Sequence, residues 1–139
     1  MIIREMTLKD IDYFVLPLEW MRDKYKQSFK TTNDPAWIME QEGRIICAFG
    51  AVFLWDGVCE IWFNAIRLEN NFVMIRMLRR HLITQCKAHC VKRLQSIVKC
   101  DYAIGKRFVE AFGFKNETPD GMKGYHPDGS SVYMYARLL

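Results

Sequence analysis

The sequence predicts an α/β domain in which α and β segments mix around a central mixed sheet. Three observations predict this class. Residues 59–66 alternate between two faces, as a strand does, and the segment after them changes to helical spacing. The dipeptide Asp56–Gly57, a common two-residue hairpin turn, joins this strand to an earlier alternating run. A further strand and helix follow at 94–100 and 103–112, and Gly113 has the position of a left-handed residue that ends a helix.

The longest helix is predicted to begin after a polar break at 67–71 and to reach about Lys92. Its apolar residues recur at spacings of three and four, which places them on one face: Ile75, Leu78, Leu82 and Cys86. Its other face is basic, with Arg76, Arg79, Arg80 and Lys87. A strand, a tight loop and a long helix form the repeating unit of open α/β sheets, and an anion can meet the helix N-terminus in such a loop.

The N-terminal part of the chain is predicted to contain one strand and two helical pieces. The strand covers 2–6, and Thr7 with Asp10 resembles a capping box, so a helix should begin at Leu8. Pro17 interrupts this helix, and a second helical piece should run from Leu18 to Phe29. The turn-rich segment 31–35 follows.

The remaining elements are strands and one more helix. The turn Glu42–Gly43 separates two strands, and the last loop leads into a closing hairpin. The predicted strands, in order, cover 36–41, 44–55, 58–66, 94–100, 115–119 and 130–139. The whole order is β-α-α-β-β-β-α-β-α-β-β, with about four helices and a central sheet of six to seven strands in a single domain, 1–139.

Composition indicates an ordinary soluble protein. No apolar run approaches the roughly 18–20 residues that cross a bilayer. The first ten residues contain acidic and basic side chains where a secretory signal has an apolar core. Five cysteines, an odd number, favour reduced thiols. We therefore expect a cytoplasmic protein, or one in the host cytoplasm or virion if it is phage-encoded.

Positive charge is concentrated in one part of the chain. Residues 76–107 hold nine Lys and Arg against a single acid, Asp101, so this block carries +8 within a chain of net charge +4. Its helical members include Arg76, Arg79, Arg80, Lys106 and Arg107. The asymmetry indicates a polyanionic or acidic protein partner. The alternative is that these are ordinary solvated helix surfaces, since Lys and Arg are common there.

The order of elements is similar to that of the GNAT N-acetyltransferases, and local patterns agree across nearly the whole chain. The segment IIREMTLKDI resembles the family's opening strand and capped helix, and GRIICAFGAVFLWDGVCEIWFNAI resembles its central meander. The segment GKRFVEAFGF is similar to its last helix with the Gly-Phe ending, and HPDGSSVYMYARLL resembles its closing hairpin. The resemblance implies the GNAT fold and, by analogy, a possible homodimer.

The resemblance also implies a cofactor site for acetyl-CoA or CoA. It would lie along the strand at Asn64 and Ile66 and along the helix start at Phe72, Met74 and Arg76, where the family carries a loop close to R-x-x-G-x-G. Glycines let phosphate approach bare backbone, whereas here Phe and Met side chains should obstruct it. Arg76 has a second reading, in which its guanidinium contacts a CoA phosphate.

The catalytic groups implied by the resemblance are incomplete. A Tyr four residues before the last glycine often acts as general acid, and Val109 occupies that position. Tyr102 lies about two helical turns earlier, too far away to replace it. Glu60 on the strand before the loop could act as the base that deprotonates an amine, or it could be a solvent-facing charge.

Three functions remain open at this point. The first is a partner-binding GNAT-like protein that has lost the cofactor loop and the general acid, as in small phage and prophage products that include internal virion proteins. The second is an acetyl-CoA-dependent N-acetyltransferase with an atypical loop. The third is a nucleic-acid or acidic-protein binder that uses the 76–107 block. Cys86, His89 and Cys90 lie within one and a half helical turns, but we expect packing and surface roles for them and no metal.

Overall fold

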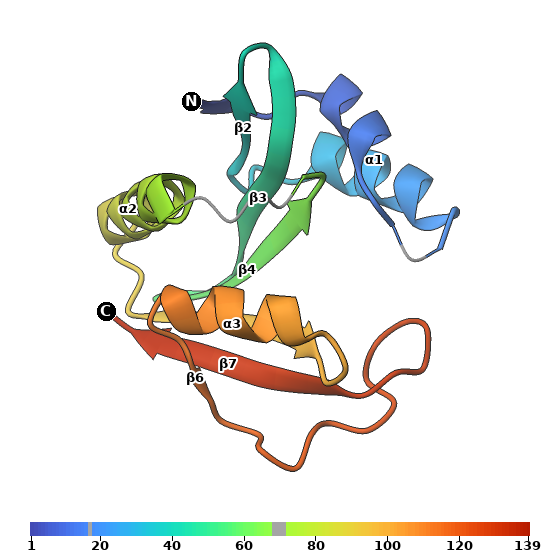
Figure 1. The fold of residues 1–139 in the computed structure, drawn as a ribbon, viewed down its shortest axis with the longest axis vertical. Coiled ribbons are helices and arrows are strands. Elements are labelled where there is room, and N and C mark those ends of the chain that lie inside the picture. Colours follow the sequence, from blue (N-terminus) through green and yellow to red (C-terminus); the bar gives the residue numbers. More distant parts are fainter. Residues whose placement is uncertain (17, 68–71) are drawn as a thin grey trace. The chain divides into compact units, whose positions relative to one another are not determined.

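The computed structural model describes residues 1–16, 18–67 and 72–139, and these form a seven-stranded mixed sheet with four helical segments (Figure 1). The strand order is β1-β2-β3-β4-β5-β7-β6. The predicted fold class and the predicted order of elements are confirmed. The chain divides into two compact units, Met1–Val52 with Ile61–Asn70, and Phe53–Glu60 with Asn71–Leu139. Their boundaries fall inside β3 and β4.

The first unit contains the N-terminal strands and helices. Its elements are β1 (Ile2–Glu5), the 3₁₀ helix η1 (Leu8–Tyr13), α1 (Met21–Thr31), β2 (Ala36–Gln41), most of β3 (Arg44–Trp55) and the end of β4 (Val58–Ala65). Both β1 with β2 and β2 with β3 pair antiparallel. Glu42 and Gly43 both have positive φ, which is the backbone that a tight hairpin turn between β2 and β3 requires. In Figure 1, η1 and α1 lie beside one another.

The two N-terminal helices differ from the prediction, the first in its type and the second in its first residue. The capping box of Thr7 and Asp10 is present, but the helix that it begins is a 3₁₀ helix that ends at Tyr13. The second helix begins at Met21 and not at Leu18. The guanidinium of Arg22 provides a physical reason, since it donates to the carbonyls of Ile11 and Phe14 and so ties the start of α1 to the end of η1. The predicted interruption at Pro17 lies outside the described residues.

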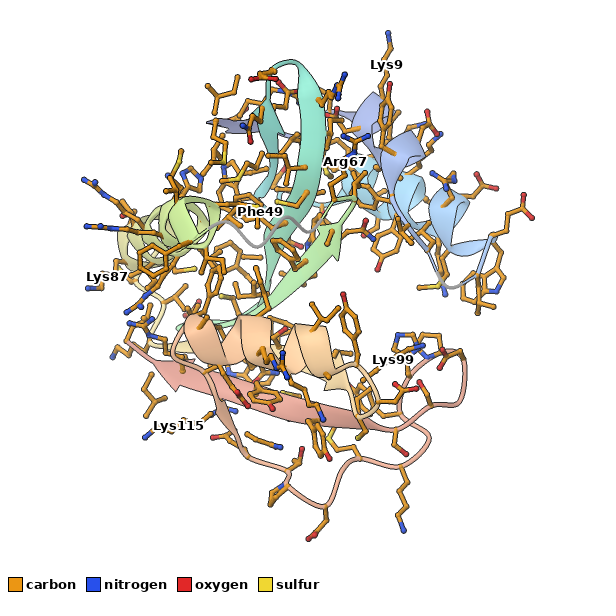
Figure 2. All side chains as sticks on the ribbon, viewed as in Figure 1. Lys9, Phe49, Arg67, Lys87, Lys99 and Lys115 are labelled. Atoms are coloured by element: carbon orange, nitrogen blue, oxygen red, sulfur yellow. The ribbon has the colours of Figure 1, made fainter. Side chains whose placement is uncertain are left out.

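An apolar core holds the first unit together. Its buried members come from η1, the strands and the segments beside them: Met6, Ile11, Phe14, Ile38 and Ala48. Trp62 packs against this core, and its ring lies 5.7 Å from the ring of Phe14. Gly50 makes room for that indole, because a Cβ at this position would approach it to 2.7 Å. Figure 2 shows the labelled Phe49 among the side chains of this region.

The second unit contains the long helix and the C-terminal strands. Its elements after β4 are α2 (Phe72–Ala88), β5 (Arg93–Lys99), α3 (Ala103–Ala111), β6 (Lys115–Asn116) and β7 (Val132–Leu138). The start of β4 pairs in parallel with β5 from Val58 to Glu60. The whole of β5 pairs antiparallel with β7, which confirms the predicted closing hairpin of β6 and β7 beside it.

Both helices of the second unit end in the same hydrogen-bonded motif. Gly113 has φ of 84°, and its N–H and that of Phe114 bond back to Glu110 and Val109, which confirms the predicted left-handed end. The helix α2 ends at Ala88, not near Lys92 as predicted. Cys90 takes the left-handed position there with φ of 56°, and because few residues other than glycine do this, the sequence carried no sign of it.

The helix α2 buries one apolar stripe, made of Met74, Leu78, Leu82 and Cys86. The predicted stripe is correct except at its first residue, where Met74 is buried and Ile75 is half-buried.

Across residues 1–16, 18–67 and 72–139, we find no helix with both the length and the apolar character needed to cross a membrane.

Candidate functional site

Glu60, the candidate base, lies on β4 opposite Gln95 of β5 and is half-buried. It belongs to the second unit and is the last residue of β4 that pairs with β5. A half-buried carboxylate at the end of a paired segment can accept a proton from an amine, so this residue remains a candidate base. Its catalytic role stays a prediction.

Asn64, a predicted cofactor contact on β4, uses its side chain to hold another part of the first unit. Its Oδ1 accepts from the backbone N–H of Val15 at 3.0 Å, and its Nδ2 donates to the carbonyl of Val15 at 2.6 Å. The side chain therefore satisfies both backbone groups of one residue, as a neighbouring strand would. Sequence reasoning missed this bond, because 49 residues separate the two partners.

Ile66, the other predicted contact on this strand, also has its backbone occupied. The N–H groups of Ile66 and Arg67 both donate to the carbonyl of Ile46, at 3.0 and 2.8 Å. A ligand could thus contact the carbonyl or the half-buried side chain of Ile66, whereas the N–H of Ile66 is already bonded. The polar break predicted before α2 includes residues 68–71, which lie outside the described residues.

The first turn of α2 contains the other predicted cofactor contacts, and they differ in exposure. Phe72 is 79% exposed, Arg76 is exposed, and Met74 is only 2% exposed. The expectation that the Met74 side chain obstructs a phosphate is therefore wrong, because that side chain belongs to the buried stripe. Phe72 remains in the position to do so.

The position of the expected general acid, Val109, is half-buried in α3 and carries no proton donor. Tyr102 is the residue before α3 and is 43% exposed. The structure adds a tyrosine that the sequence analysis missed, Tyr135 on β7, whose hydroxyl donates to Glu110 at 3.2 Å. Burial, and then this bond to Glu110, raises the pKa of Tyr135. The raised pKa makes Tyr135 a weaker acid, and its hydroxyl proton is directed to Glu110.

Solved structures, several of them described as acetyltransferases, resemble the chain over nearly its whole length. Ard1 from Thermoplasma volcanium has a TM-score of 0.77 at 17% identity, with 99% of this chain and 97% of that chain covered. The IAA acetyltransferase from Bacillus cereus ATCC 14579 also has a TM-score of 0.77, at 15% identity, with 99% of each chain covered. The acetyltransferase (GNAT family) from Bacillus anthracis has a TM-score of 0.72 at 15% identity, with 98% and 93% covered.

The chain has the GNAT fold. At such low identities the likeness shows the fold alone, so activity must be argued from the residues. No protein-family model and no curated protein matches the chain.

The basic residues that accompany this GNAT fold fall into two groups. The first group is used inside the second unit: Arg93 pairs with Glu117, Lys99 with Asp128, and Lys106 donates to the carbonyl of Cys100. Lys106 also lies over the ring of Tyr133. The predicted partner-binding role of Lys106 thus competes with two internal contacts.

The second group consists of exposed basic residues on α2. We call Arg76, Arg79, Arg80 and Lys87 the α2 basic face. All four side chains are exposed, and Lys87 projects from α2 in Figure 2. In the part of the chain that the structure describes, none of them forms an ion pair with a carboxylate. Arg107 on α3 is likewise exposed.

The residues described by the structure contain no candidate metal site. Among them, no three His, Cys, Asp or Glu side chains are placed so that they could hold a metal ion. Cys86 is buried, whereas His89 and Cys90 are exposed. The ring of His89 packs against that of Phe53, at 5.3 Å between centroids.

Proposed function

We propose that this GNAT-fold protein acts by binding an anionic partner and not by acetyl transfer. The observation that carries the proposal is the α2 basic face, four exposed cations without a carboxylate partner among the described residues. Unpaired cations on one helix face attract polyanions and speed their association. The helix α2 follows the loop where the family holds its cofactor, so the proposal assigns anion binding by a different partner to the same region.

Two features of the chain speak against the usual acetyl-transfer machinery. The first is the lack of any glycine between Val58 and Ala103, with the exposed ring of Phe72 at the start of α2. The second is Val109 in place of the usual acid. These features concern two separate parts of the reaction, the binding of the pyrophosphate and the protonation of the leaving thiolate.

The first test is thermal unfolding with and without millimolar acetyl-CoA and CoA. A ligand present at about 100 times its dissociation constant stabilises the folded state by roughly 2.7 kcal/mol, which would raise Tm by several degrees. We expect no shift with either ligand. A clear shift would overturn the proposal and direct attention to the acetyltransferase alternative.

The second test measures binding of a fluorescent single-stranded oligonucleotide over a range of salt concentrations. Replacing Arg76, Arg79 and Arg80 by Ala should weaken binding and reduce the slope of log affinity against log salt by up to about 2, since each phosphate contact on a single strand contributes about 0.7. The matched control replaces three exposed lysines elsewhere, Lys9, Lys30 and Lys115, by Ala and removes the same charge. Equal slopes for both triple variants would show that net charge, and not this face, determines binding.

The second candidate function is an acetyl-CoA-dependent N-acetyltransferase with an atypical loop. It is favoured by Glu60, a half-buried carboxylate on β4, and by the similarity to the acetyltransferases from Bacillus anthracis and Bacillus cereus. If the protein turns over acetyl-CoA and Glu60 is the base, Glu60→Gln should lower kcat by at least about 100-fold. Unchanged turnover in this variant would remove Glu60 from that role.

The proposal includes a biological setting that rests on the resemblance to phage and prophage proteins. It places the protein in the cytoplasm, or in the host cytoplasm or virion of a phage, and allows a homodimer. Size-exclusion chromatography with light scattering measures the oligomeric state directly, and a monomer at all concentrations would exclude the dimer.

A further inference from the structure

The second unit exposes three consecutive apolar side chains where β3 ends: Phe53, Leu54 and Trp55, which we call the β3 tip. The buried part of β3 stops at Ala51, and Trp55 is 66% exposed. Single apolar residues are common on protein surfaces, but large apolar side chains gathered at one place mark a surface that a partner covers. The β3 tip is therefore a candidate docking surface.

Contacts within the second unit hold the β3 tip against the end of α2. The ring of Phe53 packs against that of His89, just beyond α2, with 5.3 Å between the centroids. Because side chains alternate along a strand, Trp55 lies on the same side of β3 as Phe53. In the turn that follows Trp55, the carbonyl of Gly57 accepts from the backbone N–H of Lys92 at 2.8 Å. The tip and the segment after α2 thus form one connected surface.

Positive charge borders this surface. Lys92 is exposed, and its Cγ lies 4.0 Å from the position that a Cβ would take on Gly57, so its stem runs beside the turn. Lys87, a member of the α2 basic face, lies in the last turn of α2. No Asp or Glu occurs from 72 to 100, and Asp56 in the turn opposes these cations with a single charge. A partner that covers the tip therefore meets apolar and basic groups together.

We infer that the anionic partner is a protein segment in which acidic residues accompany apolar anchors, and that the anchors dock on the β3 tip. Its carboxylates lie against Lys92, Lys87 and the rest of the α2 basic face, where opposite charge speeds association and sets orientation. Its anchors supply affinity, because large apolar side chains that leave water at an interface dominate the binding energy. This inference rests on the proposed function and specifies the chemistry of the partner.

The charge around the β3 tip disfavours a second copy of this chain as the occupant. In a symmetric dimer the same surface of both copies meets, so the cations beside one tip would face those beside the other. Lys87 and Lys92 would then repel their counterparts, whereas carboxylates of an acidic segment neutralise them.

The aliphatic part of the surface disfavours a nucleic-acid strand. Bases stack on flat aromatic or guanidinium groups, and Leu54 offers no such face. Leu138 of β7 adds a second aliphatic side chain at this end of the sheet and is 75% exposed. Its strand partner is Arg93, whose N–H also donates to the carbonyl of Gly57. Leucine side chains are suited to the apolar anchors of a protein.

The test measures the fluorescence anisotropy of a set of labelled peptides, one by one, that combine Asp and Glu with Leu, Phe and Trp at varied spacing. Trp55→Ser should weaken the binding of the tightest of them about tenfold or more. The matched control is Trp20→Ser, which removes a tryptophan of the first unit that is 53% exposed and should change affinity less than about twofold. Peptides of equal charge with Ser at the apolar positions should bind more weakly than the parent peptides.

A second pair of variants tests the acidic residues of the partner. Lys92→Gln should weaken the acidic apolar peptides about twofold or more at low salt, and the difference should vanish at high salt. Its control is Lys30→Gln, which removes an exposed lysine from the last turn of α1. If peptides with Gln at the acidic positions bind as tightly as the parent peptides, the partner is not acidic and the inference is overturned.

The outcomes separate this inference from the proposed function. Equal affinities of Trp55→Ser and Trp20→Ser for the peptides overturn docking on the β3 tip and leave the α2 basic face as an anion site. A single-stranded oligonucleotide that binds the wild type and not Trp55→Ser overturns it in favour of base stacking. A wild-type dimer that Trp55→Ser dissociates overturns it in favour of a second copy. Binding of no probe overturns both proposals. Leu138→Ser alters one exposed side chain and keeps the test valid if Trp55→Ser does not fold.

Discussion

Replacing the buried Asp10 by Asn should destabilise the protein and flatten the dependence of its stability on pH. Asp10 is 5% exposed and accepts four hydrogen bonds, two from the guanidinium of Arg4 at 2.8 and 2.9 Å and two from Thr7. The Arg4 hydrogen bond, against the opposing effect of burial, holds the pKa of Asp10 at about 2 in place of 3.8. The carboxylate is therefore more stable in the folded chain than in the unfolded one.

The size and sign of the effect follow from that difference in pKa. A fall from 3.8 to about 2 corresponds to about 2.4 kcal/mol at neutral pH. Because a third of the Arg4 side chain is exposed, water screens part of this, and we expect about 1–2 kcal/mol. Since the folded pKa is the lower one, the stabilisation is complete above about pH 5 and is lost as the pH falls towards 2.

Urea unfolding at several pH values between 7 and 2.5, followed by tryptophan fluorescence, measures this directly. The wild type should lose its advantage over Asp10→Asn as the pH falls. The control is Asp12→Asn, which breaks an exposed pair with Lys26 and should change the free energy of unfolding by less than about 1 kcal/mol. Parallel curves for the wild type and Asp10→Asn across this range would refute the reasoning.

Three further predictions concern packing, thiols and a histidine. Gly50→Ala should lower the free energy of unfolding by about 1–3 kcal/mol, because the new methyl group meets the Trp62 indole, and an unchanged urea midpoint would contradict this. A thiol reagent should modify the exposed Cys90 first and should reach the buried Cys47, Cys59 and Cys86 only when the protein unfolds. Early modification of all five thiols would contradict this prediction. Burial lowers the pKa of His81 in the folded chain. As the pH falls, the unfolded chain therefore binds a proton at this histidine first, and the free energy of unfolding should decrease below about pH 6.5. His81→Gln should reduce this decrease when unfolding is measured at several pH values.

The parts of the fold that the sequence predicted best depend on local signals. The bounds of β2 and β3 agree residue for residue with the alternating runs, and Gly113 ends α3 as its glycine indicated. The capping box at Thr7 was also correct, although the helix that follows is of the 3₁₀ type. Each of these features is determined within a few residues, where periodicity and turn chemistry act.

The parts that sequence reasoning missed depend on contacts between distant residues. The bonds from Asn64 to Val15 and from Arg137 to Phe112 join residues 49 and 25 positions apart, and no pattern in one sequence indicates such pairs. Met74 shows a second limit, because counting from a family loop placed it at a phosphate, while the helical spacing of 74, 78, 82 and 86 buries it. The predicted stripe began at Ile75, so neither the family comparison nor the predicted periodicity placed Met74 in the core.

The two bonds of Asn64 have a consequence for chemical ageing of the protein. Deamidation of an asparagine replaces its NH₂ group by a charged oxygen without changing the size of the side chain. At position 64 the oxygen that accepts from Val15 N–H would remain, but the donor to the Val15 carbonyl would become a second acceptor that repels it. Deamidation at this residue would therefore release the stretch after η1, and peptide mass mapping of stored protein would detect the added mass unit at Asn64.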